Sequence, residues 1–144
     1  MENYRKIKRT FNAVASTLVS QMLTLFPGDP TFTQIKDALQ VLMSDRATDS
    51  KAMDKWFQTM NTNTGNGMVI GEFVMRRDES LFTLEVVDGI ISGMSTKWPR
   101  LSQENKEMVW QYLERMAKLS AQGTIAKAVK PEDVQNMLNQ LSAD

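Results

Sequence analysis

The chain alternates amphipathic stretches with short polar breaks, and within each stretch apolar residues recur at three- and four-residue spacing. This period places the apolar side chains on one face of an α-helix. The pattern predicts helices over residues 2–26, 30–43, 48–60 and 102–122, with Asp29 as the cap of the second. The last begins at a Ser102 cap and ends at Gly123, and its wide apolar arc predicts that it is the central helix.

Two further segments carry weaker helical patterns. Residues 68–76 contain several β-branched residues, and we interpret them as a short helix in preference to an extended segment. Residues 78–98 begin with an Asp78 cap and predict a helix that Gly89 and Gly93 weaken. The sequence therefore predicts helices along almost its whole length.

These segments predict an all-α protein that folds as a single compact bundle of roughly five to seven helices. Residues 1–122 form the predicted core domain, and residues 123–144 form a linker followed by a short C-terminal helix that starts at Pro131. No apolar run approaches the roughly 18–20 residues of a membrane span, and no secretory signal pattern opens the chain. We therefore expect an intracellular protein that does not bind membranes.

The amino-acid composition mainly excludes classes of function. The chain has no cysteine and no histidine, which removes thiol nucleophiles, imidazole or thiolate metal sites and Ser-His-Asp triads. It also lacks the glycine-rich phosphate loops and the nucleophile elbow of common enzymes. Its 17 basic and 17 acidic residues cancel, so a charged partner must be held by a local patch. We predict that the protein is not an enzyme and uses no cofactor.

The stretch NTNTGNGMVIGEF, residues 61–73, has the outline of an EF-hand calcium loop. Asn61, Asn63 and Glu72 fall at coordinating positions 1, 3 and 12 of such a loop. The stretch supplies a single carboxylate, whereas calcium affinity rises with the number of carboxylates, and Asn66 stands where the turn requires glycine. We predict an exposed polar connection without a metal, and a degenerate EF-hand-like ion-binding module is the alternative.

A basic cluster occupies the first turns of the first predicted helix, at Arg5, Lys6, Lys8 and Arg9. Positive charge there opposes the helix macrodipole, so the cluster does not serve helix formation. The four side chains are predicted to form an exposed stripe that is either simply solvated or binds an acidic partner. No aromatic residues interleave with it, which disfavours nucleic acid and leaves weak nucleic-acid or phosphate binding as an alternative. Trp98, on a predicted exposed connection, is a further candidate for partner binding.

Four short motifs stand in a fixed order along the chain: LFPGDPTF, MDKWF, RRDESLF and LSQENKEMVWQYLERMAKLS. Over about residues 3–121 this order resembles that of small helical proteins encoded by large nucleocytoplasmic DNA viruses of algae and amoebae. The segment between the second and third motifs is longer here than in that pattern. The residues that carry the resemblance are Phe26, Pro27, Asp29, Arg77, Asp78, Glu79, Phe82, Lys106, Val109, Trp110 and Tyr112.

The resemblance implies a viral origin and a helical fold, and it implies no reaction. The resulting hypothesis is a non-enzymatic protein-protein interaction protein that acts in a virion, in its assembly or on the host cell. Its partner would be a viral or host protein, met in the host cytoplasm or in the virion. Methionine and aromatic residues would supply the contact area, and the basic stripe would steer the encounter.

Overall fold

The structure, a computed structural model, describes residues 2–64, 67–84 and 93–128. These ranges are helical and contain no β-strand, although an isolated β-bridge joins Asn63 and Val69. The prediction of an all-α bundle is confirmed. The elements are α1 (Glu2–Leu25), α2 (Pro30–Met43), α3 (Lys51–Met60), α4 (Ile70–Arg76), the 3₁₀ helix η1 (Glu79–Thr83), α6 (Met94–Lys97), the 3₁₀ helix η2 (Trp98–Arg100) and α7 (Gln103–Ala128).

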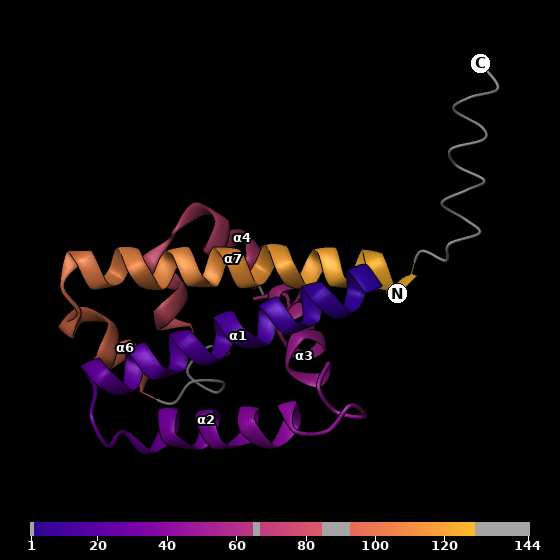
Figure 1. Ribbon diagram of the computed structural model, residues 1–144. Coiled ribbons are helices and arrows are strands. Elements are labelled where there is room, and N and C mark those ends of the chain that lie inside the picture. The colour runs from indigo at the N-terminus through magenta and orange to yellow at the C-terminus, as the bar shows by residue number, and fades with distance from the viewer. Residues whose placement is uncertain (1, 65–66, 85–92, 129–144) are drawn as a thin grey trace.

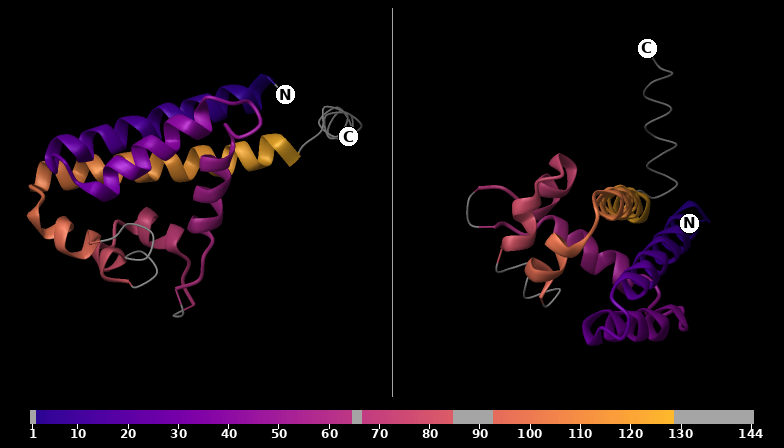
Figure 2. Two further views of the ribbon diagram at one scale, coloured as in Figure 1. Left: turned by 90° about the horizontal axis from the view of Figure 1, so that it is seen from below. Right: turned by 90° about the vertical axis from the view of Figure 1, so that its left-hand side faces the viewer.

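The long helix α7 is the centre of the bundle. Helices α1, α3 and α4 all pack directly against it, and α2 packs on α1 and α3 (Figure 1). Seen along α7, α1 and α2 lie on one side and α4, η1 and α6 on the other, with α3 running between the two groups (Figure 2). The prediction that this helix is central is therefore confirmed.

Short-range capping interactions fix several helix starts where the sequence predicts them. The Asp29 carboxylate accepts hydrogen bonds from the backbone N–H groups of Thr31 and Phe32, at 2.9 and 3.2 Å. The Ser102 hydroxyl accepts one from the N–H of Asn105 at 3.1 Å. Helix α3 begins at Lys51, slightly later than predicted. These caps satisfy backbone donors that a helix leaves unpaired at its first turn.

The predicted helix over residues 78–98 is interrupted in the structure. Asp78 caps it as expected, but only the 3₁₀ turn η1 follows, and Leu84 is already extended, with φ −74° and ψ 137°. At the other end Gly93 is left-handed, with φ 77°, and starts the separate short helix α6. A left-handed residue cannot continue an α-helix, and glycine adopts that conformation without steric cost. Residues 85–92 of this prediction lie outside the described part of the chain.

Gly123 does not end its helix, because α7 continues to Ala128. Gly123 is buried where α3 crosses α7, and a Cβ atom there would lie 2.5 Å from Cε of Met53. The glycine therefore allows close helix packing instead of acting as a cap, and the predicted helix end is wrong. The helix predicted from Pro131 lies outside the described residues.

Trp98 belongs to the core, so the prediction that it is exposed is wrong. Its side chain is 4% exposed and stacks on Phe82 with ring centroids 4.1 Å apart, while Trp110 lies 5.3 Å away. The indole N–H donates a hydrogen bond to Glu79 at 3.2 Å. The turn at η2 directs Trp98 inward, although the segment around it is polar.

Candidate functional site: a basic groove between α1 and α7

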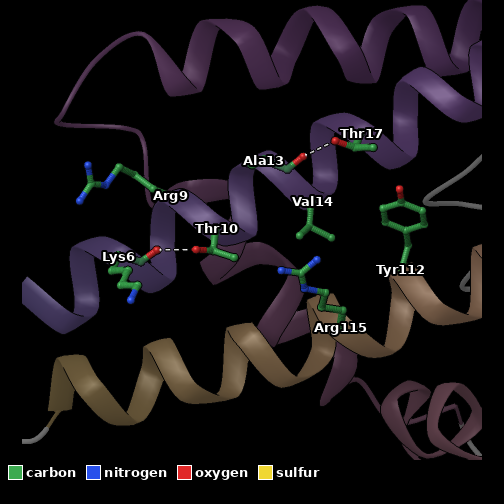
Figure 3. Close-up of a pocket in the computed structure, with 8 residues that line it drawn as sticks. All are labelled: Lys6, Arg9, Thr10, Ala13, Val14, Thr17, Tyr112 and Arg115. Carbon is green, nitrogen blue, oxygen red and sulfur yellow. Dashed lines mark hydrogen bonds between the residues drawn. The ribbon is translucent and has the colours of Figure 1, made fainter.

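An open groove of about 520 Å³ runs between α1 and α7 (Figure 3). Helix α1 contributes a strip of residues at helical spacing, and α7 contributes two residues one turn apart. Its lining combines apolar residues, Ala13 and Val14, with the cationic residues Lys6, Arg9 and Arg115. We call this feature the basic groove, and its lining residues are Lys6, Arg9, Thr10, Ala13, Val14, Thr17, Tyr112 and Arg115.

The two helices present cations from opposite sides. Figure 3 shows Lys6 extending from α1 toward α7 and Arg115 extending from α7 toward Val14 of α1. The Tyr112 hydroxyl also points toward α1, whereas Arg9 lies at the outer edge and is directed away from α7. An anionic group in the groove would therefore meet Lys6 and Arg115 first, and Arg9 would extend the positive field outward.

The threonine hydroxyls of the groove are used within α1. Thr10 donates to the carbonyl of Lys6 at 2.9 Å, and Thr17 donates to the carbonyl of Ala13 at 2.8 Å. These bonds leave the hydroxyl oxygens as acceptors. The side-chain donors available to a bound anion are therefore the cationic groups and the half-buried Tyr112 hydroxyl.

The cations of the groove have no acidic partner within the described chain. No described carboxylate lies within 4.0 Å of Lys6, Arg9 or Arg115, and all three side chains are exposed. An ion pair inside the protein would compete with an external anion for these groups. Their charge is therefore available to a partner.

Two cations elsewhere in the structure are neutralised inside the protein. Arg77, at the left-handed end of α4 with φ 52°, contacts Glu107 at 2.6 Å and Glu114 at 2.8 Å. The hydrogen bond from Arg77 lowers the pKa of Glu114, against the opposing effect of burial. Lys97 likewise pairs with Asp29 at 2.9 Å. The cations that line the basic groove differ from these two, because they have no such acidic partner among the described residues.

The four residues of the predicted basic stripe lie in different environments in the structure. Lys6 and Arg9 line the groove, and Arg5 is exposed but does not line it. The Lys8 side chain is only 14% exposed and pairs with Asp49 at 2.9 Å, so the prediction that it lies on the exposed stripe is wrong. Lys8 lies at the border of the apolar face of α1, where the loop before α3 covers it.

The residues of the EF-hand-like stretch make separate interactions with other parts of the chain. The Asn61 side chain donates to the carbonyl of Phe57 at 2.8 Å, and Asn63 forms the β-bridge to Val69. Glu72 lies on the exposed surface of α4, 4.0 Å from Arg76. Within the described ranges, no cluster of three acidic residues is suited to hold a metal ion.

Sequence reasoning missed the contribution of α7 to the groove. Tyr112 and Arg115 are one turn apart at the edge of that helix's apolar face, which is the signal that could have drawn attention to them. Helical periodicity does not reveal which neighbouring helix such an edge will meet. Only the packing of α1 on α7 joins them to Lys6.

Comparison with family models, with curated proteins and with solved structures finds no match to this chain. The resemblance to proteins of large DNA viruses therefore stays a prediction. In the described part of the chain, none of the helices is both long and apolar enough to cross a membrane.

Proposed function

We propose that the protein is a non-enzymatic interaction protein that binds an acidic segment of a partner protein in the basic groove. The observation that carries the proposal is that Lys6 of α1 and Arg115 of α7 both extend into the groove, from opposite helices, without acidic partners in the described chain. The viral setting, with a viral or host partner, rests on the sequence resemblance and is part of the same proposal.

The composition of the groove favours a protein segment over nucleic acid. Apolar side chains at Ala13 and Val14 lie between the cationic edges, which suits an acidic helix or loop that also presents a small apolar side chain. Duplex DNA presents a continuous row of phosphates, and three cations release few counterions from it. The nucleic-acid alternative therefore predicts weak binding that is lost at moderate salt.

The test compares two charge-matched double variants. Lys6→Ser/Arg115→Ser removes these two cations of the groove, and Lys36→Ser/Arg46→Ser removes one lysine and one arginine that are exposed and do not line the groove. Each variant and the wild type are used to capture partners from expressing cells, followed by mass spectrometry and by titration of the captured partner. We expect the groove variant to bind about two- to thirtyfold more weakly, because each of its two rim charges contributes about 0.2–1 kcal/mol.

Two results contradict the proposal. Equal weakening by both double variants would show that net charge, and not the groove, governs binding. Tighter binding of a short DNA duplex than of the protein partner at the same salt would assign the groove to nucleic acid. Circular dichroism of both variants checks that each remains folded.

A further inference from the structure

A second, apolar cavity lies between α2 and the helices that α2 covers. Its volume is about 440 Å³, within the roughly 300–1,000 Å³ of small-molecule sites. Its described walls are almost entirely apolar and include Met22 of α1, Leu39 of α2 and Leu113 of α7. It shares none of these described lining residues with the basic groove. This cavity is therefore a separate candidate site.

The polar groups of the cavity are concentrated on one face of α3. Lys51, Lys55 and Thr59 line it at four-residue spacing, beside Ala52 and Trp56. Both lysine side chains are exposed, and no described carboxylate lies within 4.0 Å of either. A lysine can lay its methylene stem along an apolar wall while its ammonium stays in water. The cavity thus combines an apolar interior with a cationic rim.

We infer that the cavity binds a single-chain amphiphile with an anionic head group, of the fatty-acid class. The alkyl chain lies against the apolar walls, and the carboxylate lies at the rim formed by Lys51 and Lys55. One turn of a helix about 10 Å across already fills about 420 Å³, so a partner helix could not lie inside the cavity, whereas a single alkyl chain could. Both the positive charge at the rim and the volume of the cavity therefore favour a free amphiphile as the ligand. This inference does not depend on the function proposed for the basic groove.

The test is a titration of the full-length protein with dodecanoate below its micelle concentration, followed by calorimetry and tryptophan fluorescence. We expect saturable binding at one site, and octanoate should bind on the order of a hundredfold more weakly because each buried methylene strengthens binding about fourfold. Lys51→Ser/Lys55→Ser should weaken dodecanoate binding about two- to thirtyfold, at about 0.2–1 kcal/mol for each charge, and leave the binding of dodecanol unchanged. The charge-matched Lys36→Ser/Arg46→Ser should change neither.

A cavity-filling variant provides the second arm. Ala52 lines the cavity, and Ala52→Phe should abolish the binding of both ligands while the protein stays folded by circular dichroism. Failure of the folded wild type to bind dodecanoate would overturn the inference and indicate that the chain itself fills the cavity. Equal affinity of Ala52→Phe and the wild type would overturn it as well, because the ligand would then lie elsewhere.

Discussion

Replacing Trp98 by alanine tests whether this residue supports the core or serves as an exposed anchor. In the structure its ring is 4% exposed, stacks on Phe82, contacts Trp110 edge-on and donates a hydrogen bond to Glu79. Truncation of a buried tryptophan costs about 3–5 kcal/mol, of which aromatic pairs contribute about 0.5–1.5 kcal/mol each. The loss is a large part of the roughly 5–15 kcal/mol that stabilises a domain.

Urea unfolding followed by circular dichroism measures the effect without depending on tryptophan emission. At a slope of about 2 kcal/mol per molar urea, a loss of about 4 kcal/mol lowers the midpoint by about 2 M. Trp98→Phe keeps a ring beside Phe82 and should lose less than half as much. Ile125→Ala, at a side chain that is 64% exposed, should change stability by about 0.5 kcal/mol or less. A Trp98→Ala effect as small as that of Ile125→Ala would refute the assignment of Trp98 to the core.

Two further predictions concern helix packing and acid stability. Gly123→Ala should stabilise a Met53→Ala background more than it stabilises the wild type in urea unfolding, because in the wild type the flexible end of Met53 must move and this offsets the gain in helix propensity of about 1 kcal/mol. Equal stabilisation in both backgrounds would contradict the close contact. Arg77 lowers the pKa of Glu114 from its ordinary 4.5, so this carboxylate stabilises the fold fully above that pH and progressively less as the pH falls through its lower folded value. Glu114→Gln should therefore flatten the pH dependence of stability below about pH 4.5, and an unchanged slope would show that the ion pair does not contribute.

The helical segments and most of their starts could be predicted because they depend on neighbouring residues. Apolar spacing marks each helix, and the Asp29, Asp78 and Ser102 caps bond to backbone groups two or three positions away. The width of the apolar arc was sufficient to predict that α7 is central. The prediction of one continuous helix over residues 78–98 was wrong. The spacing of apolar residues alone does not distinguish a 3₁₀ turn or a left-handed glycine from the interior of an α-helix.

The basic groove could be predicted only on its α1 side. Lys6 and Arg9 were visible as an exposed basic cluster, but nothing in the spacing separated them from Lys8, which pairs with Asp49. Arg115 is more than one hundred positions from Lys6 along the chain. Arg115 lines the groove because α7 packs against α1. The spacing of apolar residues within one helix does not predict which other helix will pack against it.

By itself the sequence determined the helical class, the approximate segments and their caps, and the apolar face of each helix. The tertiary structure alone decided which faces meet. That choice buried Trp98, neutralised Lys8 and placed Gly123 inside a helix contact instead of at a helix end. Periodicity and capping act over one or two helical turns, whereas burial and ion pairing depend on segments that are distant in sequence and meet only when the bundle packs.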